Sequence, residues 1–396
     1  MAMVAKNAAN TTTSKHKSST PSSAISVAVA ASTPADYDEH QRISTSTATV
    51  GKGATRRSQV QAVQPTLRTI DKAFIDAEPT DLQVESAIGV CSEWVRADRG
   101  TQITSQSRFW SKVFNLHLDP GLDTDHTRNP SVTLCFNSKG KNSSVAFQLQ
   151  LNPHKFSKAN TDQLILLWES LFPFGYRDVR SSARFSRLDE AADAPGLLDN
   201  LIFDRKASQT REHYFIRTDR KGLIQTGYIG EATAAVHGTI YNRHLAELFR
   251  NQRGAVVPLN EESATQILRQ VGGLIRVESR RNLHPKLTYN ELAGLPSSFA
   301  EYNLFDLSRL KPKDRNDYEL MYYIELVRLR GLHGAKHRLL ELHGKSAETK
   351  RKIMGFEERL ARTQCEWWNQ LDRTQQLGEL FDSLPIKKFL SKIGSR

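Results

Sequence analysis

Two stretches decide the fold class: SVTLCFN at residues 131–137 and SSVAFQLQLNP at residues 143–153. In the second stretch the large apolar side chains from Val145 to Leu151 alternate with other residues, which is typical of a strand that buries one face. The short polar SKGKN between the two stretches predicts a hairpin, so the two strands should be antiparallel.

The same pattern continues downstream. The further strand-like stretches are ARFSRLDEAAD at 183–193, EHYFIRT at 212–218, GLIQTGYIGE at 222–231 and LIRVESRRN at 274–282. Helical patterns occur at 159–172, with Asn160 or Thr161 as the expected cap, and at 261–271. Hairpin-connected strands with a few helices between them predict the α+β class, with a mostly antiparallel sheet and packed helices.

Composition divides the chain into three parts. Residues 1–65 are rich in Ala, Ser and Thr and have almost no large apolar side chains, which predicts a disordered N-terminal tail. Residues 66–305 hold the strands and form the predicted α+β domain, although 66–130 carry no clear pattern. Residues 306–396 are typical of charged amphipathic helices and predict a C-terminal helical module.

The overall composition excludes several classes of protein. With 38% hydrophobic and 25% charged residues, the chain is neither wholly disordered nor fibrous. Its apolar stretches fall short of the roughly 18 residues that a membrane span needs, so no membrane partner is expected. Cys91, Cys135 and Cys365 are widely separated and include no CxxC pair, which argues against a disulfide framework or a zinc site. A reducing, cytoplasmic location fits this usage.

The charge of the chain indicates a polyanionic partner. Lys and Arg number 55 against 43 Asp and Glu, which gives a net charge of +12 and a pI near 9.6. Nucleic acid is the first class of partner that such a balance suggests. Many basic proteins bind nothing anionic, so the charge alone leaves that alternative open.

Two of the strands carry charged residues at alternate positions. In LIRVESRRN, Arg276, Glu278 and Arg280 share one face, because side chains on a strand alternate between faces. In SRLDEAAD the same spacing places Arg187 and Asp189 on one face together with Phe185, and Leu188 on the other. Both strands therefore combine arginine with a carboxylate on a single face.

This combination suggests a site for a metal ion and a phosphate group. Hard divalent ions take oxygen ligands, and the guanidinium fork matches phosphate oxygens. Asp189 and Glu278 are the candidate ligands, with Asp193 or Glu190 as substitutes for Asp189. The simpler interpretation is a solvated sheet face with ion pairs between the strands.

The segment between those strands offers a nucleophile. It contains Tyr228 and Tyr241, and Tyr241 is followed by Arg243 and His244. A phenol is a poor nucleophile at its usual pKa of about 10, but a polarised phosphate and a nearby cation make attack on a phosphodiester feasible. The alternative is that both residues are ordinary half-buried strand tyrosines.

The order of four short motifs between residues 131 and 305 resembles the replication initiation proteins of rolling-circle plasmids and filamentous-type phages. The motifs are Asn152-Pro153-x-Lys155, Arg187-Leu188-Asp189, Tyr228-Ile229-Gly230 with Tyr241-Asn242, and Arg276-x-Glu278-x-Arg280. Each motif is short, and the evidence lies in their order and comparable spacing.

The resemblance implies a metal-dependent endonuclease that binds double-stranded origin DNA and nicks one strand through a phosphotyrosine intermediate. It implies Tyr241 as the nucleophile, Asp189 and Glu278 as ligands of Mg²⁺ or Mn²⁺, and four phosphate-binding arginines: Arg187, Arg243, Arg276 and Arg280. The partners would be the origin duplex, the single-stranded nick site and a host helicase, since the chain has no phosphate-binding P-loop. The C-terminal helices could read the duplex or form a homodimer.

Several departures from the family pattern keep other functions open. Small and basic residues usually follow the Tyr-x-Gly motif, whereas this chain has Glu231 to Ala235 there, and Arg243 replaces a lysine. No His-x-His pair occurs, and His333 with His337 lacks the other residues of a zinc hydrolase motif. The runner-up is therefore a catalytically inactive DNA-binding regulator of the same fold, followed by a structural or partner-binding protein.

Overall fold

The computed structural model describes residues 68–104, 109–118, 130–139, 145–206, 214–218, 224–230, 234–243, 273–365, 368 and 376–395. The predicted disordered tail, the predicted helix at 261–271 and His244 lie outside these ranges. In the described ranges, no helix has both the length and the apolar character that crossing a membrane requires.

One large sheet organises the fold. Its strand order is β2-β3-β4-β5-β1-β6-β11-β10-β9-β8, and every neighbouring pair is antiparallel. The predicted α+β class with a mostly antiparallel sheet is therefore confirmed. The strands are β1 (Thr69–Ala77), β2 (Gly100–Gln102), β3 (Trp110–His117), β4 (Ser131–Ser138), β5 (Phe147–Leu151), β6 (Arg184–Pro195), β8 (Tyr214–Thr218), β9 (Ile224–Ile229), β10 (Val236–Asn242) and β11 (Leu274–Leu287).

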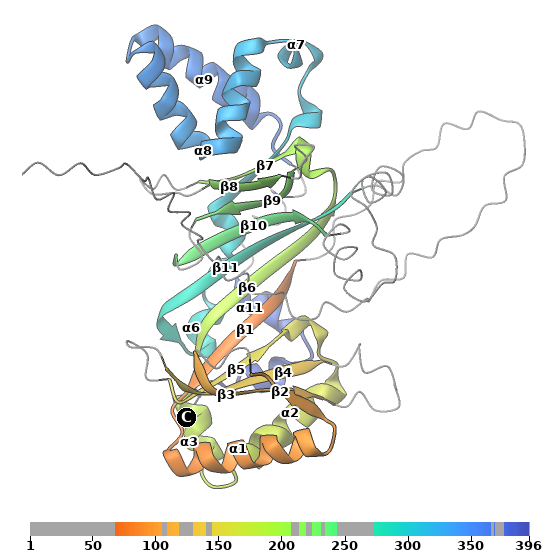
Figure 1. Cartoon of the computed structure of the whole chain (residues 1–396). Helices are drawn as coiled ribbons and strands as arrows, with labels where there is room; N and C mark the ends of the chain where they lie inside the picture. The colour runs from red at the N-terminus through yellow and green to blue at the C-terminus, as the bar shows by residue number, and fades with distance from the viewer. Residues whose placement is uncertain are drawn as a thin grey trace, which may run out of the picture. The chain divides into compact units, whose positions relative to one another are not determined.

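Helices cover one side of the first five strands of this sheet (Figure 1). They are α1 (Asp81–Arg96), α2 (Lys158–Leu171) and α3 (Tyr176–Ser182). The α1 helix lies in the region where the sequence shows no clear pattern, and a capping box of Thr80 and Gln83 fixes its start. The predicted helix at 159–172 is confirmed as α2, but its cap is Ser157, whose Oγ accepts a hydrogen bond from the backbone N–H of Asn160 at 3.2 Å.

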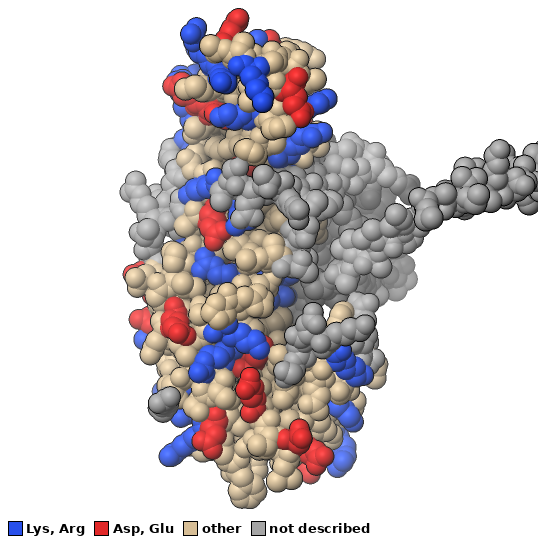
Figure 2. Space-filling view, turned by 90° about the vertical axis from the view of Figure 1, so that its left-hand side faces the viewer, with Lys and Arg blue, Asp and Glu red and all other residues tan. Residues whose placement is uncertain are grey.

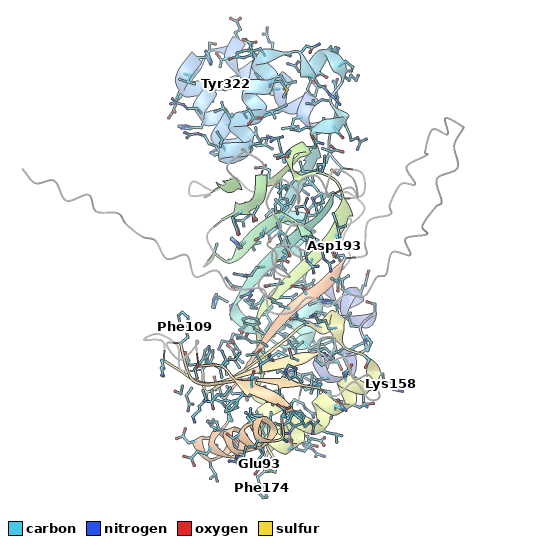
Figure 3. The ribbon with its side chains drawn as sticks, turned by 45° about the vertical axis from the view of Figure 1, so that its right-hand side comes forward. Glu93, Phe109, Lys158, Phe174, Asp193 and Tyr322 are labelled. Carbon is cyan, nitrogen blue, oxygen red and sulfur yellow. The ribbon has the colours of Figure 1, made fainter. Side chains whose placement is uncertain are left out.

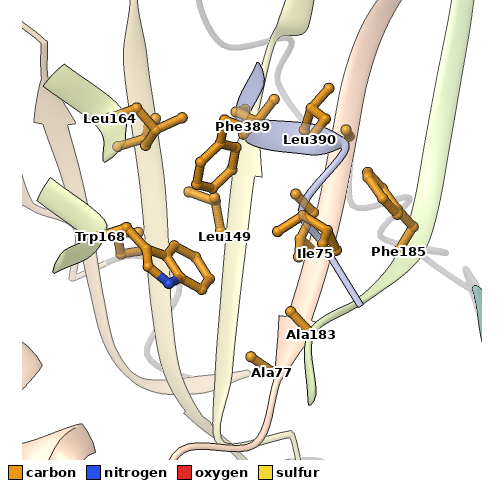
Figure 4. Close-up of a cluster of buried hydrophobic side chains, with 14 of the residues drawn as sticks. Ile75, Ala77, Leu149, Leu164, Trp168, Ala183, Phe185, Phe389 and Leu390 are labelled. Carbon is orange, nitrogen blue, oxygen red and sulfur yellow. The ribbon is translucent and has the colours of Figure 1, made fainter. Parts of the chain in front are cut away.

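The C-terminal segment packs into the same core as these helices. Helices α11 (Leu377–Asp382) and α12 (Lys387–Leu390) contribute apolar side chains to the core between the sheet and α2. Phe389 stacks edge-on against Trp168 of α2 with 5.5 Å between ring centroids. Figure 4 shows Phe389 and Leu390 between α2 and the strands that carry Ile75 and Phe185.

A second core lies on one face of β6, β11 and β10. It is covered by a two-stranded sheet of β7 (Leu201–Arg205) and β12 (Tyr302–Asp306), by the turn of η4 (Ser298–Glu301), and by Trp368. Phe203 and Tyr302 stack at 4.6 Å between ring centroids over Gly238 of β10. Gly238 permits this close approach, because a Cβ there would lie 2.8 Å from both rings.

A third core belongs to a helical unit formed by α7 (Pro312–Arg315), α8 (Tyr318–His343) and α9 (Ala347–Ala361). Gly331 has a φ of +70° and divides α8 into two pieces, 318–330 and 332–343. The second piece begins with the backbone N–H of Leu332, which donates to Asp204 of β7 at 3.1 Å. Ile202 and Phe305 of the small sheet belong to this core, so the helical unit packs on β7 and β12.

The sequence predicted one helical module at 306–396, and the structure distributes this range over three cores. Residues 307–360 supply the helical unit, Cys365 and Trp368 enter the core beneath β7 and β12, and residues 377–393 enter the core of the first half of the sheet. The amphipathic pattern of these helices was predicted, but such a pattern does not specify the surface on which a helix packs.

Candidate active site on the polar sheet face

The charged residues of β11 lie on the face of the sheet that points away from the second core. Residues directly opposite each other in an antiparallel pair share a face, so the register places three rows side by side on β10, β11 and β6. The rows are Tyr241-Arg276-Asp193, Thr239-Glu278-Ala191 and His237-Arg280-Asp189. We call this surface the polar sheet face, and Figure 3 locates it by Asp193 on β6.

The opposite face of the same strands is apolar. Ile240, Val277 and Ala192 form one row there and belong to the second core. Alternation along each strand therefore separates the two faces, as the sequence predicts for Arg276, Glu278 and Arg280. The adjoining strand β9 adds Tyr228, which lies opposite Thr239 on the polar sheet face.

Tyr241 and Glu278 form the contact at the centre of this face. The Tyr241 hydroxyl donates to Glu278 Oε1 at 2.7 Å. Arg276 Nε lies 3.1 Å from the same carboxylate oxygen, so Arg276 and Glu278 form an ion pair. A hydroxyl nucleophile, a carboxylate in hydrogen-bond reach and a third group that positions the carboxylate are the parts that nucleophilic catalysis requires.

Arg276 is the hub of a buried ion-pair network. Its side chain is 3% exposed, and it contacts Asp71 Oδ1 at 3.0 Å and Asp193 Oδ2 at 3.3 Å in addition to Glu278. Arg243 donates to the same oxygen of Asp193. Asp71 comes from β1, where a shift in register between Ile70 and Lys72 leaves it as an extra residue in the strand.

A second cluster surrounds Asp189. Arg187 donates through Nε to Asp189 Oδ1 at 2.8 Å and through its terminal nitrogen to the other oxygen, and Arg280 Nε lies 3.7 Å from Oδ1. The sequence-based placement of Phe185 on this face is wrong. A shift in register at Ser186 turns Phe185 into the first core together with Leu188, and Phe74 takes its place beneath the Arg187 guanidinium at 4.5 Å.

Burial sets the proton affinities on this face. Burial and the Glu278 carboxylate raise the pKa of Tyr241 far above its usual value. Burial and the neighbouring Asp71 raise the pKa of Glu278. Burial alone would raise the pKa of Asp189, but Arg187 and Arg280 outweigh it, so the pKa is lowered. Both pKa values are raised, so burial favours the protonated form of each group, and the phenolic proton of Tyr241 is shared with Glu278 through their hydrogen bond.

Two histidines border the site. His154, from the turn after β5, lies with Nδ1 3.2 Å from the carbonyl oxygen of Ile70 and 3.8 Å from Asp71. Burial, followed by the charge of Arg276, lowers the pKa of His154 to about 4, so its ring is neutral at pH 7. His237 donates from Nδ1 to the Gly230 carbonyl at 2.9 Å, and its ring stacks with Tyr228 at 6.0 Å between centroids.

The carboxylates of this face do not fit a divalent metal ion in the arrangement that the structure shows. Asp189 and Glu278 lie on neighbouring strands and on the same face, but Arg187 engages both oxygens of Asp189, and Tyr241 and Arg276 engage Glu278. Within the ranges that the structure describes, no group of three or more His, Cys, Asp or Glu side chains could hold a metal ion. Ligation of Mg²⁺ or Mn²⁺ stays a prediction.

The other candidate ligands from the sequence do not all lie on the polar sheet face. Asp193 lies on the polar sheet face, but Glu190 points to the opposite side and accepts hydrogen bonds from Ser297 Oγ at 2.6 Å and from the backbone N–H of Ser298 at 2.7 Å. Glu190 is therefore a structural residue and no substitute for Asp189. His333 and His337 are both exposed, as expected for a solvent-facing pair.

Sequence reasoning missed two members of the site, Asp71 and His154. Asp71 belongs to β1, which has the sequence TIDKAFIDA. Apolar residues alternate there at Ala73 and Ile75, but Asp71 is an extra residue in the strand and interrupts the pattern. His154 is the variable residue of the Asn-Pro-x-Lys motif, between Pro153 and Lys155. A titratable side chain inside that motif was the one sign in the sequence that this position could belong to the site. Of the departures from the family pattern, residues 231–233 lie outside the described ranges.

Comparisons with known proteins add little to this picture. No family model and no curated protein sequence matches the chain. Among solved structures, a rolling circle replication initiator protein from Geobacillus stearothermophilus is 10% identical, with 54% of this chain and 74% of that chain covered and a TM-score of 0.26. This similarity is too low to assign the chain to a family.

Proposed function

We propose that the protein is a replication initiation protein that nicks one strand of origin DNA, with Tyr241 as the nucleophile. The observation that carries the proposal is the Tyr241 hydroxyl at 2.7 Å from Glu278, flanked by the arginines of the polar sheet face. The rolling-circle context comes from the order of the four sequence motifs, and the basic net charge supports a nucleic acid partner.

The chemistry is an exchange of one phosphate ester for another. The Tyr241 oxygen attacks phosphorus, Glu278 takes the phenolic proton, and the bond from phosphorus to one deoxyribose oxygen breaks as that oxygen takes up a proton. The ester linkage is kept as phosphotyrosine, so a later attack by a DNA hydroxyl can reseal the strand.

The arginines bind and position the phosphate in this scheme. Arg243 and Arg280 are about a fifth exposed, at 23% and 21%, whereas Arg276 is 3% exposed. The first two are therefore partly accessible to a phosphate, and the buried Arg276 forms an ion pair with Glu278. Guanidinium groups suit this role because their parallel N–H bonds match phosphate oxygens.

Trapping the covalent adduct tests this proposal. The full chain is incubated with a labelled single-stranded oligonucleotide in the presence of Mg²⁺ or Mn²⁺, and the modified peptide is identified by mass spectrometry. We expect the adduct on Tyr241 and none in Tyr241→Phe. Tyr228→Phe is the matched control, because Tyr228 lies on the adjacent strand of the same face and should not be needed. An adduct on Tyr228, or one that survives in Tyr241→Phe, contradicts the assignment.

One observation favours the second candidate, a catalytically inactive DNA-binding regulator. The four carboxylates Asp71, Asp189, Asp193 and Glu278 are each paired with an arginine, and this closed network would bind DNA phosphate only at the cost of breaking ion pairs. Origin binding without any adduct, with each divalent ion tested, would favour the regulator.

A further inference from the structure

The helical unit contains two consecutive helices joined by a three-residue turn. The second piece of α8 ends at His343, Gly344 follows with a φ of +79°, and α9 begins after Ser346. Ser346 caps α9, because its Oγ accepts a hydrogen bond from the backbone N–H of Thr349 at 3.0 Å. A short turn that contains a glycine is the connection found in helix-turn-helix motifs, in which the second helix is presented to DNA.

The α9 helix buries one side and exposes most of the other. Ile353, Phe356 and Leu360 are buried in the core of the helical unit. At 100° per residue, the residues on the opposite side are Ala347, Arg351, Met354, Gly355 and Glu358. Gly355 confirms that this side is open, since a Cβ placed there would meet no atom within 4 Å.

Charge is distributed unevenly along this helix. Lys345, Lys350 and Arg351, at the turn and the first half of α9, are exposed and form no ion pair with any described residue. In the second half, Glu358 is paired with Arg362 at 2.7 Å and Glu357 with Lys336 at 3.5 Å. The turn and the first half of α9 therefore carry three exposed cations without an ion pair among the described residues and one exposed acid, Glu348, so their charge is positive on balance.

Figure 2 shows the charged side chains on one face of the molecule. Lys and Arg side chains are spread over the helical unit, at the top of Figure 2, with Asp and Glu among them. Most acids of the unit are engaged by named partners, for example Glu319 by Lys352 and Asp317 by Arg359 at 2.6 Å. Among the described residues, Lys345, Lys350 and Arg351 have no ion pair, and the same holds for Lys313 of α7, Arg330 of α8 and the acidic Glu348 of α9.

We propose that α9 and the turn before it bind double-stranded DNA in the major groove. Lys345 and Lys350, on the flanks of the helix start, contact phosphates, while Arg351 and Met354, on its outermost line, face the base edges. An α-helix with side chains is about 10–12 Å wide, and the major groove is about 12 Å wide. In a helix-turn-helix, the residues near the start of the second helix make the base contacts.

The composition of this surface favours a duplex over a single strand. Proteins that bind single strands stack bases on aromatic side chains, and the outer side of α9 carries none. Arginine reads guanine through two parallel hydrogen bonds, and an apolar side chain contacts the thymine methyl group. The small residues Ala347 and Gly355 allow the groove walls to approach the helix closely.

This inference extends the proposed function, because it assigns duplex recognition to α9 and leaves cleavage to the polar sheet face. The test measures binding of the full chain to a labelled duplex of random sequence by fluorescence anisotropy at several salt concentrations. The variant is Lys350→Gln/Arg351→Gln. The matched control is Lys112→Gln/Lys158→Gln, which removes two exposed cations from β3 and from α2.

We expect the α9 variant to bind the duplex at least about tenfold more weakly. The slope of log K against log salt concentration should also fall by about 2 in magnitude, because each cation that contacts the DNA contributes about 0.9 to this slope. The control should stay within about twofold of the unmodified protein. Equal weakening in both variants, or an equal loss for a single strand of the same length, would overturn the proposal and leave general charge as the cause.

A second variant separates charge from recognition. Arg351→Lys keeps the positive charge but loses the paired N–H groups. Each protein is used to select binding sequences from a pool of random duplexes. We expect the unmodified protein to enrich a defined sequence and Arg351→Lys to enrich a less defined one. Identical enrichment by the two proteins would contradict base contact by Arg351. The adduct assay distinguishes the two proposals, because Lys350→Gln/Arg351→Gln should still form the Tyr241 adduct on a single strand.

Discussion

The polar sheet face and the first half of α9 both carry basic residues, but those of the sheet face are paired with carboxylates and those of α9 are exposed. Arg276 is 3% exposed and contacts three carboxylates, from β1, β6 and its own strand. Arg351 and Lys350 are exposed and lack an acidic partner among the described residues. The sheet face thus holds its charges in fixed positions within the protein, whereas α9 exposes its charges to solvent.

This difference separates two tasks that a nucleic acid enzyme has to perform. Fixed and partly desolvated charges can orient a reacting group, because little reorganisation is needed when the reaction begins. Exposed cations attract a polyanion at a distance and give up bound counterions on contact. Substitutions in the two regions should therefore differ most in their effect on folding stability.

The largest effect is expected for Arg276→Gln. Without the guanidinium, Asp71, Asp193 and Glu278 lose their common partner in a buried place. Breaking a buried ion pair costs about 3–5 kcal/mol, so the free energy of unfolding should fall by about this amount. Urea unfolding of the purified protein measures the change, with Lys158→Gln as an exposed control. A change below 1 kcal/mol would show that the network is not stabilising.

The next effect concerns His154 and its dependence on pH. The groups that face it are Asp71, Arg276, Arg243, Lys155 and the carbonyl of Ile70. Its pKa is about 4 in the folded protein and about 6.5 when unfolded, so the unfolded chain binds the proton first as pH falls. The contribution of His154 to the free energy of unfolding is therefore fully present above pH 6.5. It is lost as pH falls toward 4, and the loss amounts to up to about 3 kcal/mol.

Unfolding measured at several pH values between 4 and 7 tests this. His154→Gln should flatten the dependence on pH, whatever it does to stability at pH 7, and His333→Gln should leave the curve unchanged, because His333 is exposed on α8. Parallel curves for the unmodified protein and His154→Gln would contradict the low pKa.

The sequence predicted the class of fold and the shared face of Arg276, Glu278 and Arg280, since both follow from a period of two along a strand. It did not predict the face of Phe185, because one extra residue near Ser186 inverts the alternation, and no residue type marks that position. The central strand β1 was missed for a related reason, as Asp71 interrupts its apolar pattern.

The structure brings the candidate residues of β6, β10 and β11 onto one face, but their contacts with one another could not be predicted from the sequence. Pairing of Asp189 with Arg187, and of Glu278 with Tyr241, depends on register between strands that are far apart in the chain. Spacing within one strand gives no register across strands. For the same reason, the amphipathic pattern at 306–396 did not indicate that α11 and α12 join the core of the first half of the sheet.

A smaller effect is expected for Gly355→Ala in α9. Gly355 lies in the interior of the helix, and the added methyl group would meet no atom within 4 Å. Glycine costs a helix about 0.5–1 kcal/mol relative to alanine, so the helical unit should become more stable by about that amount. Thermal unfolding of the full chain measures it, and a lower melting temperature would mean that this side of α9 is covered in the folded protein.

The smallest effect is expected for Arg351→Gln, which is the counterpart of Arg276→Gln. Substitution of an exposed residue without partners changes stability by less than about 0.5 kcal/mol, because neither a buried charge nor a packed side chain is lost. Urea unfolding of the two variants under identical conditions gives the comparison directly. A loss of more than 1 kcal/mol in Arg351→Gln would mean that this arginine is tied into the fold. Its positive charge would then be unavailable to DNA, and the difference between the two regions would disappear.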